Sequence, residues 1–177
     1  FSDRGGDSGA IATANYTARE FGVKSGLSIQ SAKQKLKNRT DSAFLPADFE
    51  YYSDMSEKSM NIIKKFADVF EYVGRDEAYL DVSEKVEQDF VKASHIAQQI
   101  KNEVREKTKL TCSVGISPNK LLSKIASGYK KPDGLTTVTP DKISEFMETL
   151  NLGDIHGIGK KTVQKLAEEG IETISQA

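Results

Sequence analysis

Hydrophobic positions recur along this chain with two different periods, which separate expected helices from expected strands. Apolar residues at helical spacing predict a helix over residues 48–66 and another over residues 89–107. Aromatic and β-branched residues predict strands over residues 69–83, where Gly74 breaks the run into two strands joined by a tight bend. A further strand is expected over residues 110–117.

The two ends of the chain have a different character. Residues 9–14 (GAIATA) predict a short strand of small residues, and Asn15 is a suitable N-cap for a helix that follows it. From Thr139 the pattern predicts a capped helix, a glycine hairpin and a second helix, so a small helical appendage begins there. Strands mixed with helices indicate an α+β fold or an α/β sandwich.

Composition limits the class of protein. The 177 residues are 37% apolar, enough for one domain with a real core, and no run approaches the roughly 18–20 apolar residues of a membrane helix. A single cysteine, Cys112, excludes an internal disulfide. The first twenty residues show no secretory signal. We therefore expect a cytoplasmic protein without a membrane partner.

Charge is unevenly distributed, although the net charge is only -1. Residues 101–131 contain eight basic and two acidic side chains, a net charge of +6. Such segregation is typical of a local site for a polyanion such as DNA. Solvated helix faces are the alternative interpretation.

The acidic pair Asp76 and Glu77 is the first candidate for chemistry. Neighbouring residues on a flat strand point to opposite faces, but beside a bend at Gly74 two carboxylates can converge on one cation. An isolated pair of this kind is more often solvated at the surface. Its position in an apolar strand favours pairing or a metal, because a buried charge is costly otherwise.

A second candidate comprises Thr13, Tyr16 and Arg19, which recur every three residues across a strand-to-helix junction. This spacing places a hydroxyl, a phenol and a guanidinium on one face near a helix N-terminus, where they suit phosphate oxygens. The alternative is an ordinary amphipathic helix start.

A third candidate is the glycine hairpin near the C-terminus. Gly157 and Gly159 allow a tight turn, and Lys160 and Lys161 follow directly, so backbone N–H groups can contact a DNA phosphate without reading sequence. This resembles the hairpin of a helix-hairpin-helix motif. A plain turn between helices is the alternative.

Taken in order, four segments resemble one known family. They are ATANYTAREFGVKSG, DEAYLDVS, TCSVGISPNKLLSKIASGYKKPDG and GIGKKTVQKL. Together they closely resemble the motifs of the Y-family (translesion) DNA polymerases, particularly the archaeal DNA polymerase IV-like members. The resemblance covers nearly the whole chain, and DEAYLD and KKPDG are its most specific parts.

The resemblance implies an α+β fold with a ferredoxin-like palm, a small fingers domain and a partial helical thumb containing a helix-hairpin-helix-like motif. The family layout assigns residues 1–47 to the fingers, 48–138 to the palm and 139–177 to a truncated thumb. The family's first palm strand, with another catalytic aspartate, should precede Phe1. The rest of the thumb and the little finger should follow Ala177, so we expect a truncated polymerase that is inactive alone.

Roles for individual residues follow from the same resemblance. It implies that Asp76 and Glu77 are catalytic and hold two Mg²⁺ ions. The residues implied to bind the incoming nucleotide are Thr13, Tyr16, Arg19 and Lys131. Those implied to lie over the nascent base pair are Ala10, Ala12 and Gly26, and those implied to bind DNA are Gly157, Gly159, Lys160 and Lys161.

The implied function is template-directed DNA synthesis, in which a deoxynucleotide is transferred to a primer 3′-hydroxyl during translesion synthesis and DNA repair. Expected partners are primer–template DNA and deoxynucleoside triphosphates, with a sliding clamp as a further candidate, and the protein is expected to be a monomer. The alternative is a non-catalytic DNA-binding relative that has lost the metal site. Arg75 favours this alternative, because the family usually has a small apolar residue there, whereas Asp76, Glu77 and Lys131 favour the enzyme.

Overall fold

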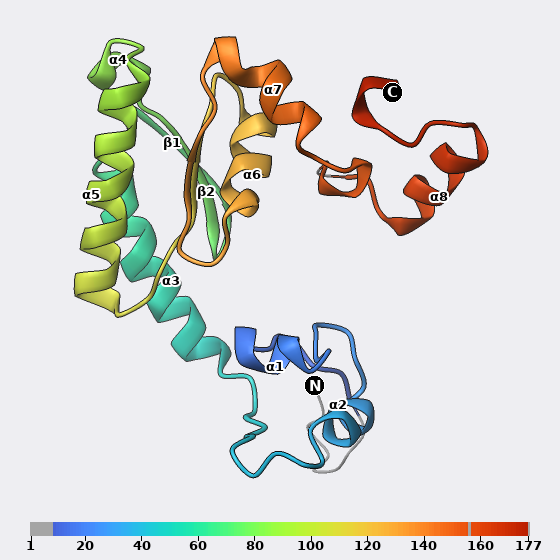
Figure 1. Cartoon of the computed structure of the whole chain (residues 1–177). Helices are drawn as coiled ribbons and strands as arrows, with labels where there is room; N and C mark the ends of the chain where they lie inside the picture. Colours follow the sequence, from blue (N-terminus) through green and yellow to red (C-terminus); the bar gives the residue numbers. More distant parts are fainter. Residues whose placement is uncertain (1–8, 156, 177) are drawn as a thin grey trace. The chain divides into compact units, whose positions relative to one another are not determined.

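The computed structural model describes residues 9–155 and 157–176 (Figure 1). The chain divides into two compact units, residues 1–52 and residues 53–177, and the boundary lies within helix α3 (Phe49–Lys64). Helices and strands both occur, which confirms the expected mixed fold.

The first unit is built on two short helices, α1 (Tyr16–Glu20) and α2 (Ile29–Lys35). Asn15 is the N-cap of α1, as predicted, and its side chain accepts a hydrogen bond from the Ala18 amide. The unit has a small core of Val23, Ala32 and Leu36 with partly buried apolar residues around it.

The strand expected over residues 9–14 is reduced to a single bridge between Ala10 and Ser28. Backbone hydrogen bonds from Ile11 to Leu27 and from Gly26 to Ile11 hold the two segments together. Ile11 and Ala14 pack against the core, but the other side chains of GAIATA are small or exposed, so the segment gains little from packing that would extend the ladder.

The second unit begins within α3 and contains most of the regular structure. Its remaining elements are β1 (Val69–Gly74), β2 (Glu77–Asp81), α4 (Ser83–Val86), α5 (Phe90–Thr108), β3 (Val114–Ile116), α6 (Lys120–Tyr129), β4 (Leu135–Thr137), α7 (Ile143–Glu148) and α8 (Lys160–Glu168). Short 3₁₀ turns span Pro140–Lys142, Leu152–Asp154 and Ile174–Gln176. Strands β1 and β2 pair antiparallel, and β3 and β4 pair parallel.

Helices α3 and α5 cover one face of the β1–β2 hairpin. Ile62 of α3 packs with Ile100 and Val104 of α5, and Leu80 of β2 lies against this cluster. The bounds of both helices agree closely with the predicted ranges, but Phe49 and Tyr52, at the start of α3, are exposed. In Figure 1 the hairpin runs between α5 on one side and α6 on the other.

Helix α6 lies directly on β3 at Gly115. A Cβ atom placed on Gly115 would lie 2.1 Å from the Ser123 carbonyl oxygen and 2.4 Å from the Ser127 amide nitrogen, both in the α6 backbone. Only a residue without a side chain permits this approach. The parallel β3–α6–β4 unit therefore depends on a glycine in β3.

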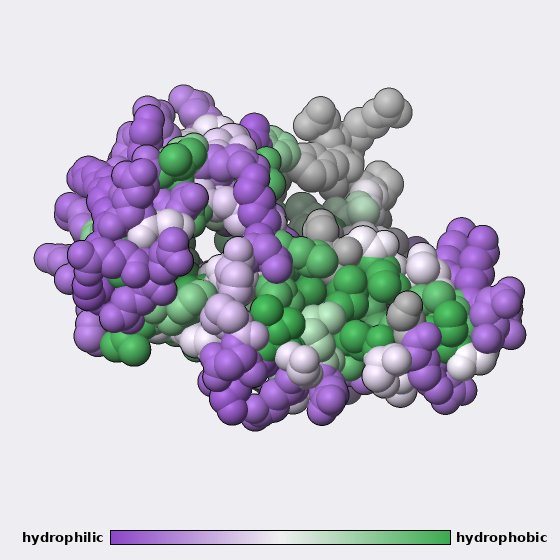
Figure 2. Space-filling view, turned by 90° about the horizontal axis from the view of Figure 1, so that it is seen from above, coloured by the Kyte–Doolittle hydropathy of each residue, from purple (hydrophilic) through white to green (hydrophobic). Residues whose placement is uncertain are grey.

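The C-terminal segment is a small helical appendage, as predicted. Tyr129 at the end of α6 makes an edge-on ring contact with Phe146 of α7 at 5.1 Å between centroids. Figure 2 shows hydrophobic residues gathered along the α7–α8 segment, on the right of the view. Its larger apolar side chains are buried or half-buried, including Leu150 and Leu152.

None of the helices in the described part of the chain has both the length and the apolar character needed to cross a membrane.

We predict opposite effects on stability for two glycine-to-alanine substitutions. Gly115→Ala forces a methyl group into the α6 backbone and should lower the free energy of unfolding by about 1–3 kcal/mol or more. Gly128→Ala, in α6 with open space around it, should raise the same quantity by about 0.5–1 kcal/mol, because alanine favours helix. Urea unfolding of both variants measures the difference, and equal stabilities would contradict the close packing.

Candidate active site

The two adjacent carboxylates lie at the turn of the β1–β2 hairpin. Gly74 pairs with Glu77, so Arg75 and Asp76 form the turn and Glu77 is the first residue of β2. Asp76 is exposed, and one of its carboxylate oxygens lies 4.0 Å from the position that a Cβ on Gly74 would occupy. The expected tight bend is present, but Asp76 lies in an exposed turn and not within an apolar strand.

Arg75 occupies the other turn position, so strand alternation does not decide its direction. Its carbonyl oxygen accepts a hydrogen bond from the Ser56 hydroxyl on α3 at 2.5 Å. Arg75 also lines an open pocket with Met60 and Tyr72. This side of the turn is therefore anchored to α3.

Glu77 is on the hairpin face that meets α6. Tyr79 follows it by two residues on the same strand face and pairs across the hairpin with Glu71. Lys124 of α6 forms an ion pair with Glu77. Lys120, one helical turn earlier, pairs with Glu71 and lies 5.6 Å from the centre of the Tyr79 ring. Two lysines of α6 thus meet the acidic face of the hairpin.

The chemistry of this donor set fits a hard divalent cation. Asp76 and Glu77 present carboxylate oxygens, the ligands that Mg²⁺ prefers, on adjacent residues at an accessible turn. The Lys124 ammonium group already lies beside the Glu77 carboxylate, so this position accommodates a positive charge. Within residues 9–155 and 157–176, no group of three or more His, Cys, Asp or Glu side chains could hold a metal. Among the described residues, the candidate ligands for a cation at this turn are therefore the two carboxylates of Asp76 and Glu77.

In the first unit the structure brings Tyr16 and Arg19 together at α1. The Arg19 guanidinium lies 4.9 Å from the centre of the Tyr16 ring, and its Nε donates to the Ala14 carbonyl oxygen at 2.9 Å. These contacts orient Arg19 on the exposed side of a short helix. Thr13 lies in the exposed segment just before the Asn15 cap.

Ala10, Ala12 and Gly26 lie in two adjoining segments of the first unit. The segment with Ala10 and Ala12 is hydrogen-bonded to residues 26–28, and all three small residues are exposed. Gly26 has φ of +82° with nothing within 4 Å of a Cβ position. The backbone turn, and not a lack of room, is what demands glycine there.

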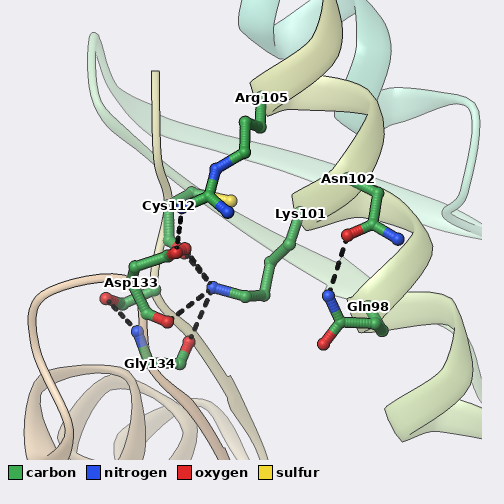
Figure 3. A network of polar contacts seen from close by, with 8 residues as sticks. Gln98, Lys101, Asn102, Arg105, Cys112, Asp133 and Gly134 are labelled. Atoms are coloured by element: carbon green, nitrogen blue, oxygen red, sulfur yellow. Dashed lines mark hydrogen bonds and ion pairs between the residues drawn. The ribbon is translucent and has the colours of Figure 1, made fainter. Parts of the chain in front are cut away.

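Lys131 is exposed in the loop between α6 and β4, and a network of polar contacts holds the far end of that loop (Figure 3). Lys101 of α5 donates to the carbonyl oxygens of Cys112 and Asp133 at 2.8 Å and to that of Gly134 at 3.3 Å. It also forms an ion pair at 2.5 Å with the Asp133 carboxylate. Arg105 contacts the other carboxylate oxygen at 2.5 Å.

The basic run of residues 101–131 is therefore not a simple surface patch. Lys101 is buried, with 8% of its side chain exposed. Lys107 pairs with Glu103 within α5, and the two α6 lysines pair with the hairpin. Much of the positive charge is matched by acidic groups inside and outside the run.

The glycine hairpin near the C-terminus precedes α8, as predicted. Gly157 has φ of +93°, and Gly159 is the N-cap of α8 without a side-chain cap. Both glycines have open space around them, and Lys160 and Lys161 are exposed in the first turn of α8. Upstream, Asn151 and Asp154 form a capping box that orders the approach to the hairpin.

Comparison with known proteins places these features in a family. The family described as impB/mucB/samB matches residues 3–128, and the helix-hairpin-helix motif of the same family matches residues 140–171. The chain belongs to this family, the Y-family DNA polymerases. The two matched ranges therefore include both the carboxylate pair at the β1–β2 turn and the glycine hairpin before α8.

Relatives of this Y-family chain include two archaeal proteins named DNA polymerase IV. The chain is 67% identical over 174 residues to that of Nitrosopumilus maritimus and 41% identical over 174 residues to that of Saccharolobus solfataricus. In each case the match covers 98% of this chain and 48% of the relative. The chain thus spans about half the length of the curated relatives it matches.

Solved structures agree with this assignment. The insertion ternary complex of Dbh DNA polymerase matches with a TM-score of 0.90 at 40% identity, covering 98% of this chain and 49% of that one. DinB from Sulfolobus solfataricus matches with a TM-score of 0.88 at 41% identity, over 95% and 48% of the two chains. These matches confirm the palm and the helix-hairpin-helix motif that the resemblance implied.

Sequence reasoning on this Y-family chain counted Lys101 and Lys124 in the basic run but did not find their partners. Lys101 lies on the buried stripe of α5, four residues after Ala97 and three before Val104, and a charge in that stripe signals a buried contact. Lys124 lies one turn after Lys120 on α6, but its partner Glu77 is 47 residues away. Spacing in sequence does not reveal such a partner.

We predict that Asp133 contributes to the loss of stability in acid. Its hydrogen bond with Lys101, with the nearby charges of Lys101 and Arg105, holds the pKa of the Asp133 carboxyl below its usual range. A lowered folded-state pKa stabilises the fold above the unfolded-state pKa of about 3.9 and loses that contribution as pH falls through the folded value.

Asp133→Asn should therefore weaken the fall in stability below about pH 4 relative to the unchanged protein. Urea unfolding across a pH series measures it, with Glu106→Gln, an exposed carboxylate of the same α5, as the control. Equal pH dependence for Asp133→Asn and the unchanged protein would contradict the assignment.

Proposed function

We propose that this chain forms the fingers, palm and part of the thumb of a template-directed DNA polymerase that acts in translesion synthesis and repair. The observation that carries the proposal is the carboxylate pair at the β1–β2 turn, set against the lysines of α6, within a chain of the Y-family. The layout of residues 1–47, 48–138 and 139–177 as fingers, palm and thumb is part of the same proposal.

Asp76 and Glu77 are the proposed catalytic residues and would hold two Mg²⁺ ions. Such cations, when bound, activate the primer 3′-hydroxyl and neutralise charge on the triphosphate. Glu77, which pairs with Lys124 in the structure, would hold a cation in place of that ion pair. Asp76, at the exposed turn, would contribute its carboxylate directly, because it forms no ion pair with any described residue.

The proposed nucleotide-binding residues are Thr13, Tyr16, Arg19 and Lys131. Arg19 and Tyr16 stack at α1, with Thr13 just before it, and offer cationic and hydroxyl donors to phosphate oxygens. Lys131 would add a further positive charge from the palm. Ala10, Ala12 and Gly26 would cover the nascent base pair, where their small size leaves room for a damaged base.

The hairpin before α8 is the proposed contact with the DNA backbone. The glycines leave its backbone accessible, and Lys160 and Lys161 add positive charge at the start of α8. Primer–template DNA and deoxynucleoside triphosphates are the proposed partners. A sliding clamp, a monomeric state and a cytoplasmic location remain predictions.

We predict that Asp76→Asn or Glu77→Gln, each made in the complete natural gene product, lowers the rate of primer extension by about 1000-fold or more. The metal contacts are worth several kcal/mol in the transition state, and each 1.4 kcal/mol is a factor of ten in rate. Binding of primer–template DNA should change little, because DNA phosphates are bound by positive charges and these two side chains carry none.

Asp81→Asn is the matched control for this experiment. Asp81 is in the same strand, but its carboxylate accepts a hydrogen bond from the Ser83 amide, a contact that asparagine retains. The control should extend primers normally. Retained extension in both test variants would refute the metal assignment, and tight DNA binding without extension by the unchanged protein would favour the non-catalytic relative.

We predict that Arg19→Ala raises the KM for the incoming nucleotide by about 10- to 100-fold, the value of a charged hydrogen bond to phosphate. Steady-state extension at varied nucleotide concentration measures it. Arg39→Ala is the control, because Arg39 is another arginine of the first unit that stacks on an aromatic ring, Phe21, and pairs with Asp41. A KM for Arg19→Ala equal to that of the control would contradict the role of Arg19.

A further inference from the structure

Lys101 of α5 is a buried charge that no step of the proposed reaction uses. Only 8% of its side chain is exposed, among the apolar residues Ala97, Ile100 and Val104 of the same helix. Burial of an ammonium group is costly unless hydrogen bonds and an opposite charge surround it. An apolar side chain would fill the same space at lower cost, so the charge itself has a use.

The contacts of Lys101 converge on one short loop. Two of the three carbonyl oxygens it binds, those of Asp133 and Gly134, belong to the loop that carries Lys131, as does its carboxylate partner Asp133 (Figure 3). The third, that of Cys112, belongs to the segment leading into β3. Lys101 therefore ties this loop to the start of the neighbouring strand.

The loop is short and is held at both ends. At its start, the Lys131 amide donates to the Gly128 carbonyl oxygen of α6 at 3.4 Å. At its end, the Gly134 amide donates to the Ser113 hydroxyl, and the Gly134 carbonyl oxygen accepts from the Val114 amide. Lys131 is two residues before Asp133, whose carboxylate pairs with Lys101.

Asp133 has a left-handed backbone conformation at the turn of the loop. Its φ of +54° is uncommon for residues other than glycine, although aspartate and asparagine tolerate it better than most. Ion pairs to Lys101 and Arg105 hold its side chain at 2.5 Å each. The network thus holds the side chain of the residue at the turn of the loop.

We infer that Lys101 is a positioning residue for nucleotide binding: through Asp133 and the loop carbonyls it sets the place from which Lys131 reaches the triphosphate. This inference rests on the proposed function. In this inference the buried Lys101 of α5 restricts the positions that the exposed Lys131 can adopt.

The test compares Lys101→Met with Lys107→Met in the complete natural gene product. Both substitutions are the same and lie in α5, but Lys107 is exposed and pairs with Glu103 in its own helix. Hydrogen–deuterium exchange of residues 131–134 and the KM for the incoming nucleotide are measured for each. Lys131→Ala and the double variant with Lys101→Met complete the set.

Lys101→Met should accelerate exchange in the loop and raise the KM about tenfold, with binding of primer–template DNA unchanged, whereas Lys107→Met should do neither. In the Lys131→Ala background, Lys101→Met should change the KM by less than about twofold, because residues that act as a unit are not additive. Independent, multiplying effects of the two substitutions would overturn the inference. So would an unchanged KM in Lys131→Ala, even if the polymerase function stands.

Asp133→Asn provides the test if Lys101→Met does not fold. Asparagine tolerates the left-handed conformation, so this variant removes the charge partner and leaves the backbone preference intact. It should show the same pattern to a smaller degree, and a loop and a KM like those of the unchanged protein would overturn the inference. If the unchanged protein does not extend primers, the proposed function fails instead.

Discussion

The close contact of α6 with β3 at Gly115 is the constraint on which the palm depends. With no side chain between them, the helix backbone lies directly against the strand, and both ends of α6 are thereby placed. Its first half brings Lys120 and Lys124 to the hairpin, and its last residue, Tyr129, leads into the loop with Lys131. One glycine thus places the helix that carries Lys120 and Lys124 and leads into the loop with Lys131.

The ion pairs of this chain differ in how deeply their side chains are buried. Lys124 and Glu77 meet at a partly exposed face, where a pair contributes little stability and can exchange partners. Lys101 and Asp133 meet at the edge of the core, where breaking the pair leaves a buried ammonium group without its opposite charge. The first arrangement suits a site that must bind and release, and the second suits a support that must not move.

Much of the fold could be predicted because its long helices carry a strong signal. The expected helices over 48–66 and 89–107 correspond to α3 and α5, and the bend at Gly74 separates β1 from β2. The prediction of a strand over residues 9–14 was wrong, because most side chains of this segment are too small to bury much apolar surface. The C-terminal hairpin was predictable because Gly157 and Gly159 have backbone requirements that are local.

The candidate site was predictable in its residue types but not in its contacts. Asp76 was expected in an apolar strand, yet the turn at Arg75 and Asp76 exposes it, and only the pairing of Gly74 with Glu77 decides this. Lys101 was counted as a surface charge, because a charge count contains no information on burial. Its partner Asp133 is 32 residues away, and Lys124 is 47 residues from Glu77, so both pairs exist only after the chain has folded.

The glycine at the start of α8 separates helix stability from ligand binding. A serine or aspartate at position 159 would offer its own oxygen to the first-turn amides and strengthen the helix. It would also compete with any external oxygen for those donors. Because Gly159 has no such oxygen, α8 begins without a side-chain cap. The helix thus gives up an internal acceptor for the amides of its first turn, because the residue at position 159 has no side chain.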